Sequence, residues 1–175
     1  MARDFLRFLR ARSADPLDSL RGGLQASTTV QAVIDALRDH ARAVTGADGI
    51  TVVERRGGEV HYLTEDAISP LWAGQAFPVQ MCVSGMAMIA RAPIVIPDIM
   101  EDKRVPLNAY LGTFVRSMAM VPIGHGDPLL AMGVYWRETR LIPQAVVETL
   151  LQIADLAADA IDRIEGPPPP ARQAA

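Results

Sequence analysis

Cysteine is almost absent from this sequence, since Cys82 is the only one among 175 residues. A single thiol allows no internal disulfide and no multi-cysteine metal site, and it gives no sign of an oxidising compartment. Long hydrophobic runs are also lacking, because Pro, Gly, Arg or Asp interrupts each apolar stretch before it reaches the roughly 18 residues of a membrane-spanning helix. These absences predict a soluble, cytoplasmic protein.

An excess of positive charge is missing as well. Lys and Arg number 17 and Asp and Glu number 20, which gives a formal net charge of −3. A protein that binds nucleic acid by electrostatic attraction needs a basic face, so we expect no nucleic-acid partner. Hydrophobic residues make up 50% of the chain, which is enough for the core of one compact domain and excludes disorder over the whole length.

The short motifs of common enzyme classes are not found either. The sequence has no G-x-x-x-x-G-K-[ST] phosphate loop, no G-x-G-x-x-G, no H-E-x-x-H and no G-x-S-x-G. His40, His61 and His125 fall in three different predicted elements, so they do not define a metal site. We therefore expect no catalytic residue and no bound metal.

The two ends of the chain differ from its centre. Residues 1–12 place arginines and large apolar residues on opposite sides of a predicted amphipathic helix. That helix either packs on the domain or a second subunit, or contacts an anionic membrane surface. Pro16 to Gln25 contains two adjacent glycines and is interpreted as a linker, so residues 1–25 precede the domain. Residues 166–175 are interpreted as a disordered, Pro-rich tail.

The central segment, residues 26–165, has the pattern of an α+β domain. Thr28 or Thr29 caps a first long helix that Gly46 ends, and a last helix runs from Pro143 to Ile164. Between them the pattern predicts an extended segment over 77–83, a short helix over 84–90, and strands over 50–55, 60–64, 94–96, 117–123 and 129–136. Tight turns between consecutive strands indicate a mainly antiparallel sheet, with the two long helices over one face.

Two features of this segment carry possible chemistry. Cys82 has apolar neighbours, which favour a buried structural residue. The other two roles considered are a ligand contact and a catalytic or covalently modified thiol. Residues 98–114 form a long polar excursion between strands, and such excursions often carry binding function. Asp98 and Asp102 in that excursion are typical of turns and caps rather than of acid–base catalysis.

Several separated segments of the sequence resemble GAF domains, most closely the GAF modules of bacterial sensor histidine kinases. They are Glu65–Met88 with its Cys82-Val83-Ser84-Gly85 core, Pro97–Pro106, and Thr113–Ile123. The resemblance covers about residues 28–164. It implies a central antiparallel sheet of about six strands with flanking helices, and a ligand cavity under residues 98–114.

The resemblance also implies a function. It favours a free-standing, non-catalytic sensory module of bacterial signal transduction, such as a two-component system, that forms a homodimer through its terminal helices and contacts a signalling partner. Bilin-carrying relatives attach pigment through a cysteine just before a histidine, and residues 98–114 contain neither. Related free methionine sulfoxide reductases need several cysteines, and Ser84 stands at one of those positions. A bilin, haem or cyclic-nucleotide cofactor is not supported.

The candidate ligand-binding residues come from an aromatic and sulfur-rich stretch between residues 70 and 140. Small-molecule pockets are largely apolar with a few placed polar groups. The expected pocket wall is Trp72, Phe77, Cys82, Met86, Tyr110, Phe114 and Trp136, with Asp98, Arg116 and Ser117 as polar anchors. The Arg116 guanidinium is suited to clamp a carboxylate or phosphate. Two alternatives stay open, namely an interaction and dimerisation module without a ligand, and a thiol-based redox sensor or reductase that uses Cys82.

Overall fold

The computed structural model describes residues 15–166, which form one antiparallel sheet with helices on both faces. The helices are α2 (Pro16–Ala26), α3 (Val30–Thr45), α4 (Val83–Ala90) and α5 (Gln144–Glu165), with two short 3-10 helices, η1 (Val79–Met81) and η2 (Leu107–Ala109). The helix expected over 1–12 and the tail expected beyond Gly166 lie outside the described residues. None of the helices in the described range is long and apolar enough to cross a membrane.

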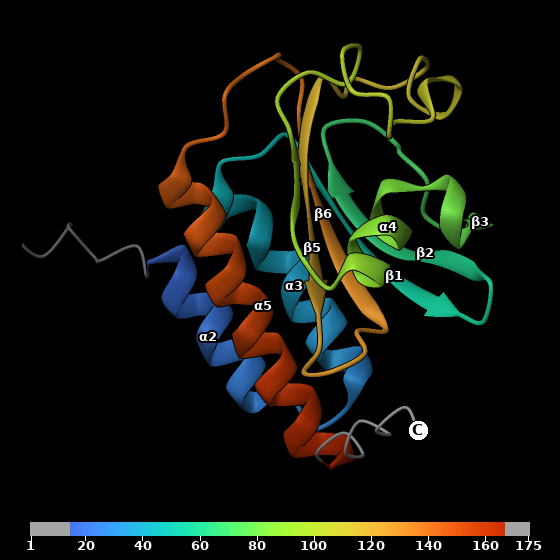
Figure 1. Ribbon diagram of the computed structural model, residues 1–175. Helices are drawn as coiled ribbons and strands as arrows, with labels where there is room; N and C mark the ends of the chain where they lie inside the picture. The colour runs from blue at the N-terminus through green and yellow to red at the C-terminus, as the bar shows by residue number, and fades with distance from the viewer. Residues whose placement is uncertain (1–14, 167–175) are drawn as a thin grey trace, which may run out of the picture.

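The six strands are joined in the order β3-β2-β1-β6-β5-β4, and every neighbouring pair is antiparallel. The strands are β1 (Gly49–Arg56), β2 (Glu59–Ala67), β3 (Ala76–Pro78), β4 (Ile94–Ile96), β5 (Ser117–Ile123) and β6 (Leu130–Trp136). Figure 1 shows α2, α3 and α5 layered on one face of the sheet, with α4 and the loop segments on the other. The expected α+β fold with about six antiparallel strands is confirmed.

The two faces of the sheet bury separate hydrophobic clusters because successive side chains of a strand point to opposite faces. In β5, Ala119 and Val121 contact the layer of long helices, whereas Met118 and Met120 lie on the face of α4. The long helices cover their face as the sequence predicted. The cluster on the other face is the one that surrounds the site described below.

The segment from Pro16 to Gln25 is not a linker, and that expectation was wrong. It forms helix α2, whose first turn begins with Pro16 and is capped by the Asp15 carboxylate, which accepts the Leu17 N–H at 3.0 Å. Leu20 and Leu24, four residues apart, share one helix face and are buried in the core. A Cβ on Gly23 would lie 3.2 Å from the Ala36 Cβ of α3. Gly23 therefore permits close packing of the two helices. The composition of the segment alone does not distinguish a glycine that serves helix packing from a glycine in a linker.

The segment expected to be extended over 77–83 turns almost at once. Strand β3 ends at Pro78, η1 follows, and Cys82 is the extended residue that precedes α4. Helix α4 packs so closely on η1 that a Cβ on Gly85 would lie 1.9 Å from the carbonyl oxygen of Val79. Gly85 is thus required at this contact, which fixes η1 and the residues before it.

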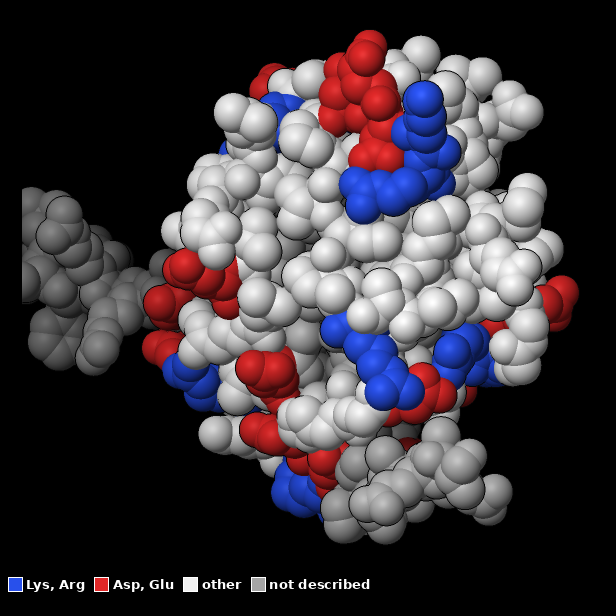
Figure 2. Space-filling model, in the orientation of Figure 1, with Lys and Arg blue, Asp and Glu red and all other residues white. Residues whose placement is uncertain are grey.

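Charged side chains are distributed without a large patch of one sign on the face seen in Figure 2. Acidic and basic groups lie beside one another there in small clusters, and a broad uncharged region separates the clusters. This distribution agrees with the small net charge of −3. It gives this face no basic surface of the kind that binds a phosphate backbone.

Candidate functional site

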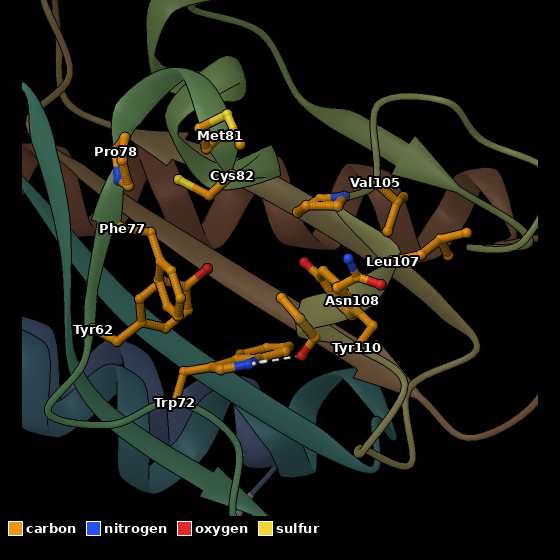
Figure 3. Close-up of a pocket in the computed structure, with 12 residues that line it drawn as sticks. Tyr62, Trp72, Phe77, Pro78, Met81, Cys82, Val105, Leu107, Asn108 and Tyr110 are labelled. Carbon is orange, nitrogen blue, oxygen red and sulfur yellow. Dashed lines mark hydrogen bonds between the residues drawn. The ribbon is translucent and has the colours of Figure 1, made fainter.

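A pocket of about 530 Å³ opens on the α4 face of the sheet, between β2, the β3–α4 segment and η2 (Figure 3). Three stretches of chain supply its lining: the start of β2 with the loop that follows it, residues 77–82, and residues 105–110. The lining residues are Tyr62, Trp72, Phe77, Pro78, Met81, Cys82, Val105, Pro106, Leu107, Asn108, Ala109 and Tyr110. Its volume lies in the range of small-molecule sites.

Aromatic rings form the buried wall of the pocket. The Trp72 ring packs edge to face on Tyr62 and Tyr110, with ring centroids 5.6 and 4.8 Å apart, and Tyr62 packs in the same way on Phe77 at 5.5 Å. On the sheet behind it, Tyr135 lies 5.5 Å from Trp72. Such edge-to-face pairs add stability beyond the area they bury. These rings therefore pack against one another as one connected aromatic cluster.

Trp72 is held in place from both ends. The Glu65 carboxylate of β2 accepts three backbone N–H groups, from Leu71, Trp72 and Ala73, each at 2.9 Å. The indole N–H donates to the carbonyl oxygen of Ala109 in η2 at 3.1 Å. This second bond ties the loop after β2 to the excursion between β4 and β5. The two loops that frame the pocket are thus fixed to each other.

The hydroxyl groups of the tyrosines are engaged within the protein. Tyr62 Oη lies 3.4 Å from Ser84 Oγ, Tyr110 donates to Met118 Sδ at 3.7 Å, and Tyr135 Oη lies 2.9 Å from Thr51 Oγ1. Burial raises the pKa of all three phenols well above the usual value, because the ionised form loses its hydration. The phenols therefore stay protonated at physiological pH and serve as neutral hydrogen-bonding groups.

Cys82 lines the pocket and is only 4% exposed. Its Sγ accepts a hydrogen bond from Ser84 at 3.5 Å and donates to the Val79 carbonyl at 3.8 Å. Within the residues that the structure describes, neither of these bonds involves a cationic side chain. Of the three interpretations of Cys82 given above, burial and the contact with the pocket fit the first two.

Four charged side chains of residues 98–116 form hydrogen bonds within that region: Asp98, Asp102, Arg104 and Arg116. Arg104 donates to both carboxylate oxygens of Asp102, from Nε at 2.9 and 3.2 Å, and these bonds hold the pKa of Asp102 below its usual range. Asp98 accepts the Met100 N–H at 2.9 Å, which closes a turn. Arg116 donates to the Val115 carbonyl at 2.8 Å. None of these residues lines the pocket.

Four of the ten candidate ligand-binding residues are brought together here, namely Trp72, Phe77, Cys82 and Tyr110. The other six lie outside this pocket: Met86, Asp98, Phe114, Arg116, Ser117 and Trp136. Strand pleating explains why two of them, Ser117 and Trp136, do not reach the pocket. They are paired in the sheet and lie on its helix-covered face. The Ser117 hydroxyl donates there to the Glu138 carbonyl at 2.8 Å. Met86 and Phe114 pack against the cluster around the pocket without lining it.

Tyr62 is the central lining residue that the sequence analysis missed. It lies in a hairpin strand whose Val60 and Tyr62 alternate with half-buried His61, so the pattern places them on a buried face. Nothing in the local sequence indicates that this face meets residues 72 and 110. The rim residues Met81 and Asn108 were also not named as candidates for the site. Met81 is 61% exposed, which an apolar side chain tolerates at a pocket mouth.

No group of three or more His, Cys, Asp or Glu side chains within residues 15–166 is arranged to hold a metal ion. The site is an apolar, aromatic cavity whose tyrosine hydroxyls and cysteine thiol are bonded within the protein, and the Asn108 amide lies exposed at its mouth. Such a cavity is suited to bind a molecule by burial and by a few hydrogen bonds.

Comparison with solved structures shows where this fold occurs. A GAF domain from an Acinetobacter phosphoenolpyruvate-protein phosphotransferase superposes with a TM-score of 0.72 at 13% identity, covering 85% of this chain and 92% of that one. A free methionine-R-sulfoxide reductase from Neisseria meningitidis superposes with a TM-score of 0.73 at 12% identity, covering 85% and 87%. The phycoerythrobilin-bound GAF domain of a cyanobacterial phytochrome gives 0.68 at 20% identity, covering 85% and 93%.

No curated protein matches the sequence. The sequence profile described as GAF domain matches residues 27–162, which is most of the chain and includes the whole sheet, α3, the pocket and most of α5. The match agrees with the resemblance that the separated segments indicated. The chain belongs to the GAF domain family.

Proposed function

We propose that this protein is a non-catalytic sensory or regulatory module that binds a small molecule in the pocket beside Trp72. The observation that carries the proposal is the cavity of about 530 Å³ with a wall of aromatic rings packed edge to face. A structural core has no need of such a space, because protein interiors are close-packed. Structural neighbours that include a phytochrome GAF domain support a sensory role.

The chemistry of the lining supports binding rather than catalysis. The phenols of Tyr62 and Tyr110 stay protonated, and Cys82 has no cation or general base among its contacts. A thiol reductase that cycles through a disulfide needs a second thiol, and the sequence has only Cys82. The redox alternative is therefore disfavoured.

The lining is also a poor fit to a bilin, the pigment that some structural neighbours hold. A bilin carries two carboxylates, and within the described part of the chain no lysine, arginine or histidine lines this pocket. Burying carboxylates without a cation is costly. The side chains of this chain thus favour a different kind of ligand.

Helix α5 is suited to carry a signal away from the site. It packs across β5 on the face opposite the pocket and lies beside α2 and α3 (Figure 1). Its Leu151 is 37% exposed.

We propose homodimerisation through this helical layer. Sedimentation of the wild type and a Leu151→Asp variant tests it, with a shift from dimer to monomer as the expected result.

The ligand proposal is tested with a variant that fills the pocket. Protein purified from its own host is analysed by native mass spectrometry for a retained small molecule, as wild type and as Ala109→Phe. Ala109 lines the pocket, so the added ring should displace the ligand. Ala73→Phe is the matched control, because Ala73 is exposed on the neighbouring loop and does not line the cavity.

The expected result is a retained mass in wild type and Ala73→Phe that is lost in Ala109→Phe. A ligand retained equally by all three proteins would place the binding site elsewhere. Substrate turnover that a Cys82→Ser variant abolished would contradict the non-catalytic part of the proposal.

A further inference from the structure

We infer that the ligand of this pocket is an uncharged, planar aromatic compound, and that the Asn108 side chain binds its one hydrogen-bonding group. The inference rests on the proposed function, since it takes the pocket as a ligand site. It follows from three properties of the lining, which are its lack of charge, the inward engagement of its polar groups, and the single free amide at its mouth.

Among residues 15–166, no charged side chain of either sign lines the pocket. Two charged side chains close to the lining in sequence are used elsewhere, because Arg104 pairs with Asp102 and Glu65 accepts three backbone N–H groups. A ligand carboxylate or phosphate buried here would meet no cation, and a ligand ammonium would meet no carboxylate. An unpaired charge in an apolar cavity is strongly disfavoured. The buried part of the ligand is therefore neutral.

The aromatic wall presents carbon surfaces to the ligand. The Trp72 indole N–H is bonded to Ala109, the Tyr62 hydroxyl to Ser84, and the Tyr110 hydroxyl to Met118. These three rings are at most 5% exposed, and their mutual edge-to-face contacts fix their planes. A flat, apolar guest gains the most contact with fixed ring surfaces.

Asn108 is the polar group that remains at the mouth. It lies in η2, between Leu107 and Ala109, and Figure 3 shows it beside Val105 and Tyr110. Within the described residues its side-chain amide makes no hydrogen bond to protein, and the residue is exposed. An amide offers both a donor and an acceptor. It is therefore complementary to one neutral group with the same pair, such as a carboxamide or a lactam.

Three probes with one skeleton test this inference: 2-naphthamide, 2-naphthoate and 2-naphthamidine, which are neutral, anionic and cationic. Binding is followed in 1H–15N NMR spectra through the indole N–H signals. The protein has two tryptophans, and Trp72 lines the pocket whereas Trp136 lies on the opposite face of the sheet. A shift of Trp72 alone locates binding in the pocket.

We expect 2-naphthamide to shift the Trp72 signal and to bind at least about tenfold more tightly than either charged probe. Asn108→Leu should weaken 2-naphthamide about three- to tenfold, which corresponds to the loss of hydrogen bonds between neutral groups. Gln80→Leu is the matched control, since Gln80 is an exposed amide one residue before the rim residue Met81 and does not line the cavity. It should leave the affinity unchanged.

Tighter binding of 2-naphthoate or 2-naphthamidine at Trp72 would overturn the inference and leave the pocket as a ligand site. Equal effects of the two leucine variants would overturn the role of Asn108. Silence of Trp72 toward all three probes at millimolar concentration would also overturn the inference, and the retained-ligand measurement then decides the proposed function independently.

Discussion

Replacing Glu65 by Gln tests the idea that one carboxylate fixes the pocket wall. Glu65 Oε1 accepts the Leu71 N–H, and Oε2 accepts those of Trp72 and Ala73. A glutamine has the same shape but only one acceptor oxygen. If that oxygen serves Trp72 and Ala73, the amide NH2 faces the Leu71 N–H, and Leu71 is buried. At least one backbone donor is then left without a partner.

The cost follows from the bonds that are lost. A buried donor without a partner costs about 1–3 kcal/mol, and the two remaining bonds lose the contribution of the negative charge. Because Glu65 is half-buried rather than fully buried, we expect Glu65→Gln to lower the free energy of unfolding by about 2 kcal/mol. Glu65→Ala, which removes all three bonds, should cost about 3 kcal/mol.

Urea denaturation followed by tryptophan fluorescence measures the effect, and hydrogen exchange of the amides at 71–73 locates it. Glu59→Gln is the matched control, because Glu59 lies on the same strand and its side chain is 60% exposed. We expect it to change the stability by less than about 0.5 kcal/mol. Equal stability of the two glutamine variants, with unchanged protection of residues 71–73, would refute the role assigned to Glu65.

Three other predictions concern the scaffold. Gly85→Ala should destabilise the protein by about 2 kcal/mol or more, because the new Cβ would clash with the Val79 carbonyl. Gly22→Ala should stabilise the protein by about 0.5–1 kcal/mol, because nothing lies within 4 Å of the new Cβ in the helix. Thermal unfolding measures both variants, and the opposite order of stability would contradict the packing. Tyr135→Phe and Thr51→Val should each cost about 1–2 kcal/mol and the double variant less than their sum, since the two hydroxyls are buried partners; additive losses would count against that bond. A hydrogen bond to Asp162 raises the pKa of His125, so the stabilisation that this bond gives the fold is complete below about pH 6.5 and is lost as the pH rises through the folded pKa. An NMR titration of Asp162→Asn should show the pKa of His125 returning toward its usual value. An unchanged pKa would contradict this cause.

Local sequence patterns sufficed for most of the elements. Thr29 caps α3 through its side chain, Gly46 ends that helix in the left-handed conformation, and the Gly57–Gly58 turn joins β1 to β2. These signals act over a few residues, so the sequence contains them directly. The same local logic failed at Gly22 and Gly23, where the glycine at 23 allows contact with Ala36 in another helix.

The sequence by itself determined the fold class and the alternation along β5. Its ten candidate ligand-binding residues included four that line the pocket and six that do not. Only the tertiary structure decided that Tyr62 completes the wall, that Arg116 is turned to a backbone carbonyl, and that Trp136 faces the helices. The physical reason is that a strand's period tells which residues share a face but not which face meets the cavity. That choice is made by the packing of α3 and α5 on one side and of α4 and η2 on the other.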